Sequence, residues 1–232
     1  MTAFAEGNYE QAVIELFENM GYMHIYGPGA EFRDYRCPFI YDVLKDRLEQ
    51  LNNGLPEEGI QDALRKLTTF ENAELVQKNE RFMDYLQNGI PVRFYVNGEA
   101  RDTLAYLIDY HHTENNIFIV ANQWTFVENS EKRPDVILFI NGLPLVIIEL
   151  KSPSREETNA SDAYLQLRNY MQEIPTLFIY NAICVMSDMA ESKAGTITSG
   201  EERFMAQDLR ITKQERTQLP NVNLNSYRKL LD

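Results

Sequence analysis

Three charged residues interrupt the most apolar stretch of the chain. Asp135 follows Pro134 at the start of this stretch, and Glu149 and Lys151 stand two residues apart at its end. A carboxylate within a strand that is apolar on both faces is costly to bury unless it is paired or binds a metal ion. Two carboxylates suit Mg²⁺, which prefers oxygen ligands, and a nearby lysine could orient or deprotonate a water molecule and offset charge at a phosphate. The three residues therefore suggest metal-dependent phosphodiester hydrolysis.

The same pattern also has an ordinary structural explanation. Glu149 could belong to a surface ion pair at a strand end, while Asp135 simply begins a strand. The strand register decides between the two, because residues on neighbouring antiparallel strands share a face when they lie opposite each other. A two-residue turn at Asn141-Gly142 would pair Asp135 with Ile148 and turn Glu149 to the other face. A shared metal ion needs a wider loop of three or five residues, or a bulge, and we predict the wider loop.

Two other segments carry residues that could join this site. Glu10 lies on the apolar stripe of the first predicted helix, where a carboxylate is either a functional group or a residue favoured by the helix dipole. Gln166 and Tyr170 are four residues apart on a later predicted helix, so they face the same way. Ordinary surface amphipathicity explains this second pair equally well.

The first half of the chain has a helical pattern. Apolar spacing predicts a first helix from about Asn8 to Gly21, followed by an irregular connection over residues 22–36. The segment from Cys37 to about Asn88 contains three further helical stretches and reads as a helical insert.

The pattern changes to that of strands at Ile90. Alternating apolar residues lead into Asn97-Gly98, the strongest short hairpin signal. Further strands are predicted at 103–110, 117–127, 135–140 and 144–151, then a helix from about Ser161 to Glu173, and after Pro175 the segments LFIYN and AICVMSD. The late order of strand, strand, helix, strand predicts a mixed sheet with a helical crossover before its third strand. The fold class is therefore α/β, a mixed central sheet flanked by helices.

Composition and charge narrow the possible functions. A chain of 232 residues, 44% of them hydrophobic, can bury a substantial core in one or two domains. Its net charge of −13 counts against a stand-alone DNA-binding protein, whose surface would carry clustered lysine and arginine. Polar residues break the longest apolar stretch, so no membrane span is expected. Cys37 and Cys184 lie far apart and no signal peptide is visible, which predicts a reducing, cytoplasmic location.

Several motifs occur together in one order. The run RPDVILFINGLPLVIIELKSP holds Pro-Asp and Glu-x-Lys elements, and QLRNY follows in the next helix with a Q-x-x-x-Y spacing. Glu10 precedes a Gly-aromatic pair, Gly21-Tyr22, and TSGEERFMA stands at residues 198–206. Over roughly residues 6–206 this arrangement resembles the N-terminal domain of the R subunit of type I restriction enzymes, a PD-(D/E)xK nuclease.

The resemblance implies a restriction-endonuclease-like nuclease domain over residues 1–206, with its insert at about 37–88 and a segment of uncertain structure at 207–232. It implies Mg²⁺-dependent cleavage of double-stranded DNA. The implied metal ligands are Asp135, Glu149 and Glu10, and the other implied catalytic residues are Lys151, Gln166 and Tyr170. Family members continue into an ATP-driven motor and act with methyltransferase and specificity subunits. The chain has no P-loop sequence, so ATP is expected only in such a motor, and we interpret the chain as part of a longer protein.

Two alternatives stay open on the sequence. The first is a catalytically idle docking module that keeps the nuclease fold, in which the two carboxylates need not lie close enough to share an ion. The second is a stand-alone repair nuclease with the same core, against which the helical insert and the acidic charge argue.

Overall fold

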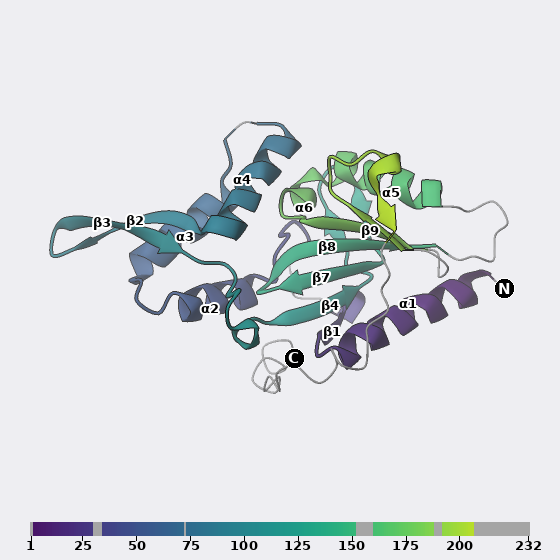
Figure 1. Ribbon diagram of the computed structural model, residues 1–232, viewed down its shortest axis with the longest axis horizontal. Coiled ribbons are helices and arrows are strands. Elements are labelled where there is room, and N and C mark those ends of the chain that lie inside the picture. Colours follow the sequence, from purple (N-terminus) through teal and green to yellow (C-terminus); the bar gives the residue numbers. More distant parts are fainter. Residues whose placement is uncertain (1, 30–33, 72, 152–159, 188–191, 207–232) are drawn as a thin grey trace.

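The computed structural model describes residues 2–29, 34–71, 73–151, 160–187 and 192–206 (Figure 1). Segment 207–232, whose structure the sequence left open, lies outside the described residues. The described part has a seven-stranded mixed sheet flanked by helices, which confirms the predicted α/β class. In spatial order its strands are β1 (Met23–Tyr26), β4 (Phe118–Asn122), β7 (Val136–Ile140), β8 (Leu143–Leu150), β9 (Ile183–Ser187), β10 (Ser192–Gly195) and β11 (Met205–Ala206). None of the helices in these ranges has the length and apolar character needed to cross a membrane.

The pairing of the strands shows how the chain crosses the sheet. β4, β7 and β8 pair antiparallel in turn, while β8 and β9 are parallel. Helix α5 (Ala160–Glu173) lies between β8 and β9 in the sequence and forms the predicted crossover. A second short helix, α6 (Pro175–Ile179), follows it. Part of the segment LFIYN lies in this helix, whose first residue is a proline, and the strand after the crossover falls on the segment AICVMSD.

The central strands bury both of their faces. Residues packed against α5 and α6 are Ile119, Ala121, Ile137, Phe139 and Ile147. Residues packed against Ile14 of α1 (Thr2–Asn19) are the alternate ones, Val120, Val136, Leu138 and Ile148. Figure 1 shows α1 running along the sheet near β1 and β4, with α5 near β9. The continuous apolar runs of β7 and β8 follow from this double coverage.

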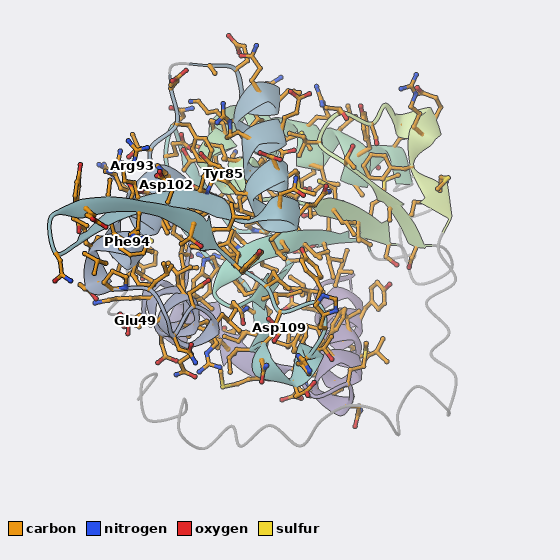
Figure 2. The ribbon with its side chains drawn as sticks, turned by 60° about the vertical axis from the view of Figure 1, so that its left-hand side comes forward. Glu49, Tyr85, Arg93, Phe94, Asp102 and Asp109 are labelled. Atoms are coloured by element: carbon orange, nitrogen blue, oxygen red, sulfur yellow. The ribbon has the colours of Figure 1, made fainter. Side chains whose placement is uncertain are left out.

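The predicted helical insert lies between β1 and β4. Its helices α2 (Tyr41–Leu51), α3 (Glu57–Thr68) and α4 (Leu75–Asn88) lead into the hairpin of β2 (Ile90–Val96) and β3 (Glu99–Ala105). Helices and hairpin share a second apolar core that also takes in Leu143 and Leu145 of β8. Figure 1 shows the hairpin extending away from the central sheet. Arg93 and Asp102 face each other across it with Nε and Oδ1 2.8 Å apart (Figure 2).

Several connections differ from the predictions. β1 falls in the segment expected to be irregular and pairs in parallel with β4, a long-range contact that leaves no local signal. The strand predicted over 103–110 ends at Ala105. That over 117–127 divides into β4 and β5 (Phe126–Val127), and β5 pairs with β6 (Glu131–Lys132). Helix α1 begins at Thr2, several residues before the predicted start. Short 3₁₀ helices lie in connections at η1 (Gly27–Gly29), η2 (Thr113–Asn115) and η3 (Glu201–Arg203).

The turn between β7 and β8 is a tight one. Asn141 and Gly142 have φ of 52° and 80°, and Ile140 pairs with Leu143, so the loop has two residues. The prediction of a wider loop is wrong, because Asn-Gly supplies the two positive φ angles that a short hairpin turn needs. A Cβ on Gly142 would lie 2.5 Å from the carbonyl oxygen of Ile40, so the turn is packed closely against the start of α2.

Candidate active site

A β-bulge in β8 sets the register at the candidate site. Leu138 pairs with Val146 and Phe139 with Pro144, which leaves Leu145 as an extra residue in β8. With a two-residue turn and a regular ladder, Asp135 would lie opposite Ile148. The bulge instead pairs Val136 with Ile148, and the next position along the ladder places Asp135 opposite Glu149. Directly opposed residues have Cβ atoms about 5 Å apart, so the two carboxylates share one face after all.

That face is the one covered by α5. Ile147 and Met186 belong to the apolar layer beneath α5. Ile148 points to the opposite face, where it packs in the layer of Ile14. Because side chains alternate along a strand, Glu149 lies on the same face as Ile147. Glu149 is 1% exposed, whereas Asp135 is half-buried at the start of β7. Glu149 therefore lies at the end of β8, on the face of the sheet that α5 covers.

Burial and mutual repulsion govern the charge of the two carboxyl groups. Burial, followed by the negative charge of Asp135, raises the pKa of Glu149 to about 8. Burial also raises the pKa of Asp135 to about 6, against the lowering effect of a hydrogen bond from the Leu150 N–H to Oδ2 at 2.8 Å. Each carboxyl thus lies close enough to shift the pKa of the other. Ionisation of both carboxyl groups at once is therefore unfavourable unless a positive charge lies nearby.

Lys151 supplies one positive charge and connects the strand to the helix. Its Nζ lies 2.8 Å from Oε1 of Glu149 and donates to Oε1 of Gln166 at 2.8 Å. The Gln166 amide in turn donates from Nε2 to the Tyr170 hydroxyl at 2.7 Å. Burial raises the pKa of Tyr170, and the charge of Glu149 raises it further. The structure therefore brings Asp135, Glu149, Lys151, Gln166 and Tyr170 together.

The donor set fits a divalent cation. Glu149 Oε2 is buried and accepts no hydrogen bond among the described residues, although a buried carboxylate oxygen normally has a partner. A cation bound between Glu149 and Asp135 would satisfy this oxygen and offset the repulsion between the carboxylates. Within the described ranges, no group of three or more His, Cys, Asp or Glu side chains is arranged to hold a metal ion. The fit thus rests on the pair of carboxylates.

Glu10 lies at the edge of this site and reaches the sheet from the other side. Its helix packs on the face opposite α5, and its two carboxylate oxygens accept hydrogen bonds from Asn122 Nδ2 at 2.7 Å and Gln123 Nε2 at 2.6 Å. Its negative charge nevertheless contributes to the raised pKa of Asp135. Glu10 is therefore near the carboxylate pair without forming a three-membered ligand group with it.

Sequence reasoning missed the residues at the end of β4. Gln123 has a φ of 52°, unusual for a residue other than glycine, and its N–H donates to the carbonyl oxygen of Asp135 at 3.0 Å. Asn122 is 6% exposed and pairs with His24 of β1. These residues were missed because β1 was not predicted. The parallel pairing of β1 with β4 brings His24 beside Val120 and near Asn122.

Comparison with known proteins identifies the family of the chain. A family model described as the type I restriction enzyme R protein N terminus matches residues 3–203. The type I restriction enzyme HindI endonuclease subunit of Haemophilus influenzae is 31% identical over 208 residues, which is 86% of this chain and 20% of that protein. The MjaIXP endonuclease subunit of Methanocaldococcus jannaschii is 33% identical over 204 residues, 84% of this chain and 20% of that protein. The chain spans about a fifth of the length of these relatives, and it belongs to the family of type I restriction enzyme R protein N termini.

Proposed function

We propose that this chain is a Mg²⁺-dependent nuclease domain that cleaves double-stranded DNA as the N-terminal part of a type I restriction enzyme R subunit. The observation that carries the proposal is the pairing of the buried carboxylate of Glu149 with the half-buried one of Asp135, beside Lys151 on one face of the sheet. Relatives named as restriction enzyme endonuclease subunits support it. A structural ion pair would not need a second carboxylate opposite the first.

Each residue has a distinct task in this proposal. Asp135 and Glu149 hold the cation through their carboxylate oxygens. The cation, when bound, acts as a Lewis acid that favours hydroxide at neutral pH and neutralises charge on the phosphate. Lys151 orients the attacking water and adds positive charge beside the phosphate. Gln166 holds the Lys151 ammonium through the hydrogen bond described above, and Tyr170 fixes the amide of Gln166.

The larger assembly is part of the proposal. Because the chain covers about a fifth of its relatives, we infer a longer subunit with an ATP-driven motor that acts with methyltransferase and specificity subunits in the cytoplasm. The net charge of −13 supports this inference, since other domains would then supply the basic surface that grips DNA. ATP would bind to that motor and not to this chain.

The decisive experiment changes Glu149 in the full-length subunit assembled with its partners. Glu149→Ala should lower the rate of DNA cleavage by more than about a thousandfold, because it removes one of two cation ligands and leaves Lys151 without its carboxylate. ATP hydrolysis by the same complex should stay unchanged. Glu114→Ala, at an exposed glutamate of η2, is the matched control and should leave both activities intact. Cleavage that survives Glu149→Ala would overturn the proposal.

The idle docking module is tested by metal binding. If the carboxylate pair is functional, Mn²⁺ used as a probe should bind the wild-type chain below millimolar concentration, and Glu149→Ala should abolish that binding. A wild-type chain that takes up no Mn²⁺ at millimolar concentration would favour the idle module.

A further inference from the structure

Two amide side chains grip the carboxylate of Glu10. Asn122 Nδ2 donates to Oε1 at 2.7 Å, and Gln123 Nε2 donates to Oε2 at 2.6 Å. The donors are consecutive residues where β4 ends, and the acceptor comes from α1, more than a hundred residues earlier. Both oxygens are therefore fixed in direction by one short segment of the sheet.

The orientation of the Asn122 amide is itself fixed. Because Nδ2 donates to Glu10, Oδ1 is the atom that accepts from His24 Nε2, 2.8 Å away, and that ring nitrogen must carry a proton. Asn122 is 6% exposed, so its amide is largely shielded from water. His24, Asn122 and Gln123 thus make one connected set of donors that ends on Glu10, which we name the Glu10 clamp.

The Glu10 clamp also touches the candidate active site through the backbone. The Gln123 N–H donates to the carbonyl oxygen of Asp135 at 3.0 Å, and Gln123 holds a φ of 52°. Gly27 lets the chain pass closely here, since a Cβ on it would lie 2.4 Å from the Gln123 carbonyl oxygen. The residue that holds Glu10 is thereby the same residue that locates Asp135.

Attachment of α1 does not require these polar contacts. Ile14 is 1% exposed and packs in an apolar layer with Val120 and Ile148. The Tyr9 hydroxyl also lies 2.5 Å from Ser187 Oγ, on another strand of the sheet. Neither contact involves the Glu10 carboxylate, so its hydrogen bonds with Asn122 and Gln123 are additional to the attachment of the helix.

We propose that His24, Asn122 and Gln123 are positioning residues that hold Glu10 as a further acidic group near Asp135, and so strengthen the binding of a divalent cation to the pair of Asp135 and Glu149. The proposal rests on the proposed function, because it assumes that the pair binds a cation. Glu10 acts by its charge next to Asp135, and the three positioning residues act only through Glu10.

The test measures the dissociation constant of Mn²⁺ for the 232-residue chain by electron paramagnetic resonance of the free ion. Asn122→Ala should weaken binding about tenfold, as the loss of an outer-shell partner of a metal site does. Glu10→Gln should weaken it to a similar extent, and the double variant should be no weaker than Glu10→Gln alone. Gln123→Gly removes the second amide, keeps the backbone donor to Asp135 and suits a positive φ, so it should weaken binding without loss of stability.

A matched control separates positioning from general destabilisation. Asn52, in the helical insert, is another buried asparagine, 8% exposed, whose Nδ2 donates to the carbonyl oxygens of Leu48 and Tyr106. Asn52→Ala should lower stability and leave the Mn²⁺ dissociation constant unchanged. The clamp is refuted if Asn122→Ala and Gln123→Gly bind Mn²⁺ like wild type, or if the effects of Asn122→Ala and Glu10→Gln multiply in the double variant. If Asn122→Ala does not fold, Gln123→Gly decides.

The outcomes distinguish this proposal from the proposed function. If Glu149→Ala abolishes Mn²⁺ binding while the clamp variants do not weaken it, only the clamp fails. If the wild-type chain binds no Mn²⁺, both fail together.

Discussion

Glu149 shows most clearly how burial in the fold opposes the negative charge that the proposed function needs. Its Oε1 contacts Lys151, its Oε2 accepts no hydrogen bond among the described residues, and Asp135 stands opposite. In the metal-free chain this arrangement disfavours the charged form, as the raised pKa shows. The same arrangement favours a cation, because a cation removes both the repulsion and the unsatisfied oxygen.

A pH dependence of stability follows from the two raised pKa values. The pKa is about 8 for Glu149 and about 6 for Asp135, both above ordinary values, so the folded chain keeps protons that the unfolded chain has released. The metal-free fold therefore gains stability from these groups at acidic pH and loses it as pH rises from about 4 through 8. Glu149→Gln should remove most of this loss, and its melting temperature relative to wild type should rise between pH 5 and 8 by about 5 °C.

The comparison variant for this measurement is Glu114→Gln, at an exposed site. Its melting temperature should follow wild type at every pH. If wild type instead became more stable than Glu149→Gln as the pH rises toward 8, the inference that burial disfavours the charged form of Glu149 would be contradicted. Millimolar Mn²⁺ should narrow the difference between wild type and Glu149→Gln, because the cation stabilises only the carboxylate.

The contacts of Lys151 with Glu149 and of Gln166 with Tyr170 were predictable from spacing alone. Residues two apart on a strand or four apart on a helix share a face whatever the rest of the fold does. The partners of Glu10 were not predictable in this way, because they join α1 to the end of β4 across more than a hundred residues.

At the level of elements, the β-bulge at Leu145 decides whether the charged residues of β7 and β8 form a site. Register reasoning identified the requirement correctly, since a tight turn without a bulge would separate Asp135 from Glu149. The prediction of a wide loop was wrong because the Asn-Gly sequence at the turn favours a two-residue hairpin loop. Pro144, which cannot donate to the ladder, is compatible with a bulge in this central strand but does not single out Leu145 as the extra residue. The Leu145 side chain joins the core beneath the helical insert, so tertiary packing accounts for its place.

The turn that precedes the bulge should be unusually intolerant of substitution. Gly142 and Gly98 both follow asparagine in tight hairpins, with φ of 80° and 83°. A Cβ at Gly98 would meet nothing within 4 Å, whereas one at Gly142 would lie 2.5 Å from the Ile40 carbonyl oxygen. Gly98→Ala should cost about 1 kcal/mol for its backbone conformation, and Gly142→Ala at least about 2 kcal/mol more, because the backbone must move. Denaturant titration of both variants measures the difference in unfolding free energy. Equal losses would show that packing against α2 does not restrict the turn.

The secondary structure of the insert was well predicted, and the edges of the sheet were not. Helices α2, α3 and α4 can be predicted from apolar periodicity over ten or more residues. β1 has four residues, and its pairing partner β4 lies about ninety residues away. Short strands of this kind depend on neighbours that a single segment cannot reveal.

At the scale of the whole molecule, the excess of negative charge limits what the chain can do by itself. A net charge of −13 repels a polyanion at long range, and the carboxylates of Asp135 and Glu149 add to this repulsion before a cation binds. The proposed nuclease would then act only where other domains bring DNA to it. This arrangement would also protect unrelated DNA from cleavage.

We therefore expect weak DNA binding by the isolated chain. Its dissociation constant for a double-stranded oligonucleotide should exceed about 100 μM at about 150 mM salt, because the net charge of −13 repels the phosphates. Fluorescence anisotropy would measure it, with the full-length subunit as the comparison. Nanomolar binding by the chain alone would contradict the division of labour proposed above.

The buried side chain of Asn141 has a consequence for the motions of the whole fold. Its Oδ1 accepts from the Ile117 N–H at 2.8 Å, its own N–H donates to the Ile117 carbonyl oxygen at 2.8 Å, and its Nδ2 donates to Leu107 and Asn116. In amide hydrogen exchange, the protons on Asn141 and Ile117 should therefore be among the last to be replaced by deuterium, and only when the entire chain opens. Amides of the β2–β3 hairpin should exchange far sooner. Early exchange at Ile117 would instead reveal a local opening at this junction, through which the insert could loosen the register of β7 and β8.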